Sequence, residues 1–114
     1  GKTAPDIFLD DQSLVLDTEK GLVLVLGCAH SGMINIIHHV IHKTGKENFK
    51  AILGGTHLDF LTPEQLEESI KALKKMTIDK IGVSHCTGMR AAFRLQQEFG
   101  DRFSYGCVGS FLEF

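Results

Sequence analysis

A chain of 114 residues with 43% hydrophobic and 23% charged side chains has the composition of one ordinary globular domain, spanning residues 1–114. The 12 basic and 14 acidic side chains leave a formal charge of −2, which provides no attraction to nucleic acid or to membrane surfaces. No apolar stretch approaches the ~20 residues of a membrane-spanning helix, and no signal-like segment opens the chain, so we expect a cytoplasmic protein. Because the chain starts at Gly1 rather than Met, we expect it to be part of a larger functional unit.

The first predicted elements are a hairpin and a helix. We interpret residues 12–17, QSLVLD, as the first arm of a hairpin, and after the turn TEKG the apolar run GLVLVLG predicts a strand buried on both faces. From Gly32 to Gly45 the apolar residues recur at helical spacing. The opposite side of that helix carries Asn35 and the three histidines His38, His39 and His42, which we interpret as a solvated face rather than a metal site.

The rest of the chain alternates strands with helices. FKAILGG at residues 49–55 predicts a short buried strand. Thr62 and Pro63 then have the pattern of a helix N-cap followed by proline at the first helical position, and the helix should extend to about Met76. Residues 78–85 predict a third core strand, Thr87-Gly88 opens a helix that stops at Gly100, and residues 103–113 add one or two strands. This alternation predicts an α/β domain with a largely parallel or mixed sheet flanked by helices.

Ligand-type side chains follow each of the three core strands. Cys28 and His30 come after the first, His57 after the second, and His85-Cys86 after the third. In open α/β sheets the carboxyl ends of the strands meet at the edge where ligands bind, and thiol and imidazole groups are ligands for zinc and related ions. We therefore expect a metal or substrate site there, with His30 and His85 as the favoured functional residues.

Simpler interpretations compete for the other residues. A free cysteine is often a small buried apolar side chain, which is as plausible as a metal ligand for Cys28 and the favoured reading for Cys86. Cys107 we assign to the core. Thr87 and Gly88 lie where a helix N-terminus would hold phosphate or carboxylate, although a plain helix cap is equally consistent. Three cysteines are too few for a secreted disulfide scaffold, so we expect reduced thiols.

The stretches GLVLVLGCAHSGMINII, AILGGTHL and IGVSHCTGMRAAFRLQQEFGDRF together resemble the C-terminal half of metallo-β-lactamase-fold hydrolases. The branch that they resemble is the one related to the dihydropterin-phosphate synthases of methanopterin biosynthesis. The resemblance implies half of an αββα sandwich and a divalent metal, most often zinc and sometimes iron or manganese, that activates water for attack on an ester, amide or phosphodiester-like bond.

Carried over residue by residue, the resemblance makes His85 of SHCTG the last histidine ligand. GCAH occupies the position where many members place a bridging aspartate, so Cys28 or His30 takes that role. His57 of GGTHL becomes a group on the substrate side, and Thr87 and Gly88 would hold an anionic part of a small, possibly phosphorylated substrate.

The family signature HxHxDH, which supplies most ligands of the first metal and the catalytic aspartate, is absent from the 114 residues. We therefore expect a metal-dependent hydrolase or transferase segment that needs an N-terminal half, or a second copy paired through an exposed sheet face, to become an enzyme, and we assign no catalytic residue. The alternative is a non-catalytic metal-binding or oligomerisation module. A redox protein using Cys28 and Cys86 is least favoured because no CxxC motif is present.

Overall fold

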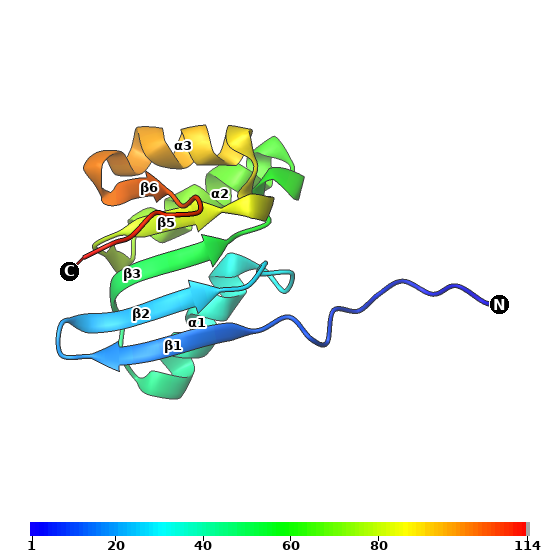
Figure 1. Cartoon of the computed structure of the whole chain (residues 1–114), viewed down its shortest axis with the longest axis horizontal. Helices are drawn as coiled ribbons and strands as arrows, with labels where there is room; N and C mark the ends of the chain where they lie inside the picture. Colours follow the sequence, from blue (N-terminus) through cyan, green and yellow to red (C-terminus); the bar gives the residue numbers. More distant parts are fainter. Residues whose placement is uncertain (114) are drawn as a thin grey trace.

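A six-stranded mixed sheet organises the chain (Figure 1). The computed structural model describes residues 1–113. The strands are β1 (Ser13–Thr18), β2 (Gly21–Leu26), β3 (Asn48–Gly55), β4 (Thr77–Ile78), β5 (Ile81–Ser84) and β6 (Phe103–Tyr105). Their order is β1-β2-β3-β5-β6, with β4 paired to β3. The hairpin pair β1–β2 is antiparallel and the other pairs are parallel, which confirms the predicted α/β class and mixed sheet.

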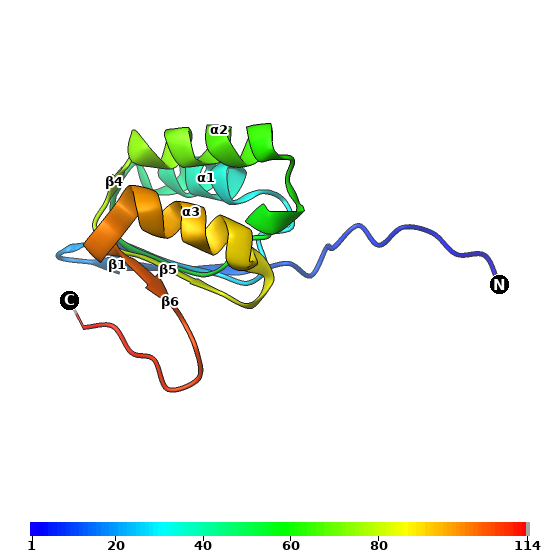
Figure 2. The same ribbon diagram turned by 90° about the horizontal axis from the view of Figure 1, so that it is seen from above.

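Three helices cover one face of this sheet. They are α1 (Met33–Thr44), α2 (Pro63–Lys74) and α3 (Met89–Phe99), and short 3₁₀ turns form η1 (Leu58–Phe60), η2 (His85–Thr87) and η3 (Gly100–Arg102). All three helices lie on the same side of the strands in Figure 2, and the segment after β6 runs on the opposite side. The sheet therefore has one covered face and one open face. None of the helices in residues 1–113 is long and apolar enough to cross a membrane.

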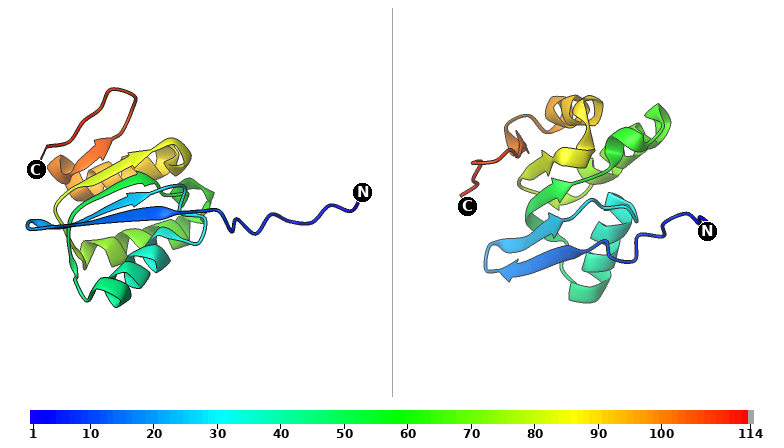
Figure 3. Two further views of the ribbon diagram at one scale, coloured as in Figure 1. Left: turned by 60° about the horizontal axis from the view of Figure 1, so that its bottom comes forward. Right: turned by 45° about the vertical axis from the view of Figure 1, so that its right-hand side comes forward.

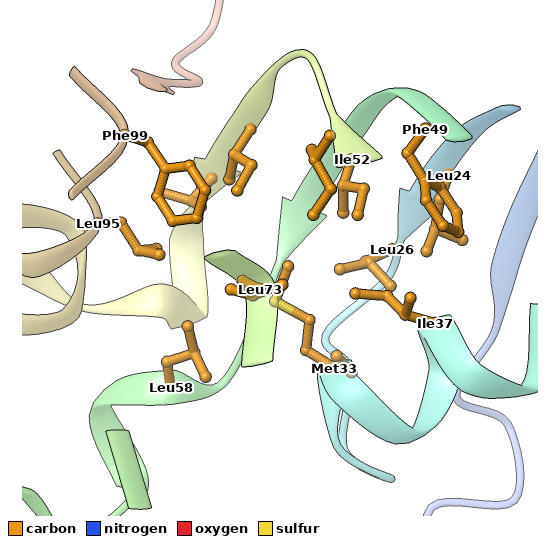
Figure 4. Packing of buried hydrophobic residues seen from close by; sticks show 14 of the residues in the cluster. Leu24, Leu26, Met33, Ile37, Phe49, Ile52, Leu58, Leu73, Leu95 and Phe99 are labelled. Carbon is orange, nitrogen blue, oxygen red and sulfur yellow. The ribbon is translucent and has the colours of Figure 1, made fainter. Parts of the chain in front are cut away.

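The core lies between the sheet and the three helices. Leu22, Leu24 and Leu26 of β2 alternate toward this side, where they join Met33 and Ile37 of α1 in one buried cluster (Figure 4). Ile52, Ile70, Leu73, Ile81 and Leu95 extend the cluster across β3, α2, β5 and α3. The helical spacing of the apolar residues placed them on this inner face, and the three histidines of α1 are exposed as predicted.

The open face carries apolar side chains that none of the three helices covers, although Val23 among them is buried. Leu14 and Leu16 of β1 are 58% and 48% exposed, and they pair directly with Val25 and Val23 of β2. Leu53 of β3 continues the same surface. We call Leu14, Leu16, Val23, Val25 and Leu53 the open-face residues. A groove of about 820 Å³ lies over four of them, and its other wall is the segment after β6. Figure 3 shows this segment on the side of the sheet opposite the helices.

The predicted helix ends are confirmed in two places. Gly45 closes α1 in the left-handed conformation and donates its N–H to the carbonyl of Ile41. Thr62 begins α2 with a full capping box, because its hydroxyl accepts from the N–H of Gln65 while its own N–H donates to the Gln65 side chain.

Other predictions were wrong in detail. The strand expected over residues 78–85 is divided into β4 and β5 at Asp79-Lys80, where Asp79 points outward to pair with Lys50. Residues 103–113 contain one strand, β6, within the prediction of one or two, but it ends at Tyr105 and the segment beyond it lies on the surface. Cys107, expected in the core, belongs to that segment and is exposed. The predicted start of the last helix is nearly correct, because Gly88 is the N-cap of α3 and only Thr87 belongs instead to η2.

Candidate metal centre

The strands β2, β3 and β5 end at one edge of the sheet, on the right in Figure 1. Cys28 and His30 follow β2, His57 follows β3, and η2 begins with His85 directly after β5. Since β3 lies between β2 and β5, side chains from the turns after the two outer strands reach across the end of β3. The edge predicted from the sequence therefore gathers these residues, but in two separate groups.

The first group is formed by Cys28, His85 and Cys86, which we call the thiol–imidazole cluster. Their ligand atoms all lie within 4.8 Å of one another. Cys28 Sγ is 3.1 Å from His85 Nε2, and Cys86 Sγ lies 3.5 Å from the Cys28 carbonyl oxygen. Within residues 1–113, Cys28, His85 and Cys86 are the histidine, cysteine or carboxylate side chains that lie close enough together to bind one metal ion.

Glycine at position 55 makes room for this cluster. A Cβ atom there would lie 2.6 Å from Cys86 Sγ and from the Gly27 carbonyl oxygen, and it would also collide with the His85 ring. The end of β3 must therefore lack a side chain if the turns after β2 and β5 are to meet above it.

The charge balance of the cluster fits a cation. Burial raises the pKa of the Cys28 thiol, and the neighbouring Cys86 and Asp11 raise it further. A thiolate is therefore disfavoured here without a positive partner, which a metal ion would supply. Two thiols and an imidazole are the donors that zinc prefers, and Ser84 Oγ, 3.2 Å from His85 Nδ1, holds the second ring nitrogen.

The second group is a series of neighbouring rings, of which the two outer pairs are stacked and the central pair is tilted. Phe8 stacks on His30 with ring centroids 4.0 Å apart, His30 lies 4.3 Å from His57, and His57 lies 4.4 Å from Phe60. The structure thus places His30, predicted as a metal ligand, beside His57, predicted as a substrate contact. It places Cys86, predicted as a buried apolar residue, in the thiol–imidazole cluster. The binding roles of His30 and His57 remain predictions.

A pocket of about 480 Å³ opens beside these rings. His30, His57 and Phe60 line it together with residues of α1 and α2 such as Asn35 and Gln65. His57 has a left-handed backbone (φ 54°), and its Nδ1 is buried without a hydrogen-bond partner in the described part of the chain. A strained residue with an unpaired polar atom at a pocket wall is typical of a functional position.

Thr87 and Gly88 are positioned by a local polar network. The hydroxyls of Thr87 and Thr56 are both buried and lie 2.9 Å apart. The Asp59 side chain packs directly against Gly88, where any Cβ would collide with it, and its carboxylate pairs with Arg90 at 2.9 Å. An anion bound at Gly88 would have to displace Asp59, so the predicted anion site stays a prediction.

Sequence reasoning missed Asp11. Its carboxylate accepts hydrogen bonds from the backbone N–H groups of Cys28 (3.4 Å) and His30 (2.9 Å), and so it holds the turn after β2 in place. The available signal was an acidic residue two positions before β1, the antiparallel partner of β2. That signal is weak, because Asp10 and Asp11 also suit an ordinary turn.

These features define one half of a metallo-β-lactamase-type α/β fold. The crystal structure of Tm1679, a metal-dependent hydrolase of the β-lactamase superfamily, matches 97% of the chain with a TM-score of 0.88 and 32% identity. The matched part is 43% of that hydrolase. No protein-family model matches the chain.

Two curated relatives come from Methanocaldococcus jannaschii. The 7,8-dihydropterin-6-methyl-4-(β-D-ribofuranosyl)-aminobenzene-5′-phosphate synthase is 35% identical over 114 residues, which is all of this chain and 39% of the synthase. An uncharacterized protein is 34% identical over 98% of the chain and 40% of its own length. The chain is therefore a partial-length homologue of that synthase and of a metal-dependent hydrolase of the β-lactamase superfamily, and it spans about two fifths of their length.

Proposed function

We propose that the chain forms one half of a metal-dependent hydrolase or transferase, in which Cys28, His85 and Cys86 hold a divalent ion, most plausibly zinc. The observation that carries this proposal is the thiol–imidazole cluster, whose ligand atoms lie within 4.8 Å of one another at the ligand-binding edge of the sheet. Zinc sites of enzymes commonly use three protein ligands and leave one position open. Iron and manganese are the alternative metals, of which manganese suits a thiolate-rich donor set least.

A zinc ion at this position supplies Lewis-acid chemistry and activates water. Other residues of this chain would orient the metal ligands. Ser84 fixes the ring of His85, and Asp11 fixes the backbone of the turn that carries Cys28. The pocket beside His30 and His57 is the place for the substrate, with His57 on its wall. By analogy with the synthase that the chain resembles, the substrate is a small phosphorylated or pterin-like molecule.

The partner of the chain follows from the open face and from the absent HxHxDH motif. Exposed apolar surface such as that of Leu14 and Leu16 is rarely left uncovered in water. We propose that an N-terminal half carrying HxHxDH, or a second copy of the chain, covers it and completes the site. The same surface also supports the alternative function, a non-catalytic metal-binding or oligomerisation module located in the cytoplasm.

Metal content tests the proposal. Chelator-free preparations of the wild-type chain and of a Cys28→Ala/His85→Ala variant are compared by elemental analysis and by the visible spectrum of the cobalt-substituted protein. We expect near-stoichiometric metal and a sulfur-to-cobalt charge-transfer band in the wild type, with both lost in the variant. A His38→Ala/His39→Ala variant, altered on the solvent face of α1, serves as the control and should retain metal.

Equal metal content in the wild type and the cluster variant would overturn the proposed centre. A His30→Ala variant tests whether the ring series takes part in metal binding. It loses metal if His30 is a ligand and retains metal if the thiol–imidazole cluster suffices. Adding the N-terminal half of a relative then distinguishes the proposed enzyme from the alternative, a non-catalytic module. Turnover of a phosphodiester or pterin phosphate supports the enzyme, and bound metal without turnover supports the module.

A further inference from the structure

Two of the three cysteines lie close together although 57 residues separate them in the chain. Cys28 Sγ and Cys86 Sγ are within 4.8 Å of each other, both thiols are free, and both side chains are partly exposed to solvent. Rotation of one side chain between staggered positions moves a sulfur by about 3 Å, which is enough to bring two such atoms to bonding distance. The sequence offers no CxxC motif, so only the sheet order produces this pair.

We propose that Cys28 and Cys86 form an intramolecular disulfide when the chain meets a peroxide, and that this disulfide and the metal exclude each other. The disulfide rests on the geometry of the two thiols alone. The exclusion rests on the proposed function, because oxidation would consume two of the three sulfur and nitrogen donors and leave only His85.

The chemistry needs one equivalent of hydrogen peroxide as oxidant. Cys28 sulfur attacks a peroxide oxygen, the O–O bond breaks, and the thiol proton passes to the leaving hydroxide, so that one water departs and Cys28 becomes a sulfenic acid. His85 Nε2, 3.1 Å from Cys28 Sγ, is placed to accept the thiol proton as the sulfur attacks and to pass it to the leaving hydroxide, so that the step needs no preformed thiolate. Cys86 sulfur then attacks the sulfenic sulfur, the S–O bond breaks, and a second water leaves with the Cys86 proton.

The surroundings favour closure within the chain over reaction between chains. The carbonyl of Cys28 lies 3.5 Å from Cys86 Sγ. Because Gly55 has no side chain, the two turns that carry the cysteines can approach each other this closely. Cys107 is exposed on the segment after β6 and is not part of the group formed by the other two thiols. Cys107 therefore serves as an internal control, because it reports how fast an exposed thiol of this chain is oxidised without a neighbouring thiol.

The test uses the full chain, freed of metal with EDTA and reduced with a phosphine that is then removed. Limiting hydrogen peroxide is added, free thiols are blocked with N-ethylmaleimide, and the products are examined by intact mass and non-reducing peptide mapping. We expect loss of two hydrogen atoms, one maleimide on Cys107, and a linked peptide containing Cys28 and Cys86. Oxidation spread over all three thiols, or disulfides involving Cys107, would overturn the proposal.

Two variants and a zinc arm complete the design. Cys107→Ser should form the disulfide as the wild type does, and Cys86→Ser should instead accumulate sulfenic acid at Cys28 that dimedone traps; circular dichroism verifies that each variant folds. Zinc-loaded chain should resist peroxide, and oxidised chain should bind no zinc until the phosphine restores it. If the reduced chain fails to bind zinc, the proposed function is contradicted but the disulfide proposal stands. If the chain binds zinc but gives no linked peptide, the disulfide proposal is contradicted.

Discussion

Backbone conformation at single residues decides which ligand-type side chains meet. Ala29 lies between Cys28 and His30 and has a left-handed backbone with φ 60°, which a residue with a side chain rarely adopts. This turn directs Cys28 toward His85 and His30 toward the rings of Phe8 and His57. Two neighbouring residues with similar chemistry thus join different groups, and Asp11 stabilises the arrangement by accepting their N–H groups.

Position 55 provides a sharp test at this scale. In Gly55→Ala the new methyl group would collide with the His85 ring and lie 2.6 Å from Cys86 Sγ, so we expect the turns after β2 and β5 to separate. Overpacking of this kind costs about 1–3 kcal/mol of folding free energy. The expected result is lost metal binding together with a lower urea midpoint, measured by metal titration and by circular dichroism.

Gly106→Ala is the matched control for this substitution. A Cβ atom at position 106 would meet its nearest neighbour at 3.5 Å, an ordinary contact. We expect its stability to stay within about 0.5 kcal/mol of the wild type and its metal binding to be unchanged. If Gly55→Ala behaved like Gly106→Ala, the close approach of the three turns would be refuted.

At the scale of elements, ion pairs join the two helices that lie over β5 and its neighbours. Arg94 of α3 makes a two-point contact with Glu67 of α2, at 2.6 and 2.7 Å, and also contacts Glu98 at 3.1 Å. Lys74 of α2 pairs with Glu98 at 2.7 Å. The hydrogen bond from Arg94 lowers the pKa of Glu67, and those from Lys74 and then Arg94 lower the pKa of Glu98.

These shifts predict how stability depends on pH. Each carboxyl group has a lower pKa in the folded chain than its ordinary value of 4.5, so the unfolded chain takes up protons first as the pH falls. The stabilisation is present above that value and is lost below it. Urea unfolding at neutral pH and at about pH 3.5 should show a smaller acid-induced loss of stability in Glu67→Gln/Glu98→Gln than in the wild type.

Glu68→Gln is the control, since Glu68 forms no ion pair within residues 1–113. It should retain the acid sensitivity of the wild type. Identical pH dependence in all three proteins would show that the helix-joining ion pairs contribute nothing measurable, as many exposed pairs do.

At the scale of the whole molecule, the sheet is covered on one side only. The three helices account for the buried core, whereas the open-face residues present an apolar surface that runs across β1, β2 and β3. The chain spans about two fifths of the length of the relatives that it matches. A surface of this kind in a half-length homologue is most simply explained as the site of a second layer.

Association should therefore depend on the open face. We expect the wild type to show concentration-dependent association, or tight binding of an N-terminal half, in sedimentation velocity. Leu14→Lys/Leu16→Lys should abolish that association while leaving unfolding nearly unchanged, because both side chains are about half exposed in the single chain. Phe93→Lys removes an exposed apolar side chain of α3, on the helix-covered side of the sheet, and should still associate. Equal association of the two variants would contradict the assignment of the open face.

Much of the fold followed from local sequence patterns. The helical spacing around Met33 and Ile37, the capping residues Thr62 and Gly45, and the apolar run of β2 each specify an element through interactions within a few residues. For the same reason the alternation of strands with helices was sufficient to predict a mixed α/β sheet. The division of residues 78–85 and the exposed position of Cys107 were missed, because both depend on contacts with distant segments.

The amino-acid sequence by itself thus determined the elements, the class of fold and the edge at which the ligand-type residues lie. Only the tertiary structure decided that Cys86 joins Cys28 and His85 while His30 stacks on Phe8 and lies at a tilt beside His57. Spacing along the chain does not specify the backbone angles of Ala29 or the side-chain directions after each strand. Those follow from the packing of three turns around Gly55, which no local pattern contains.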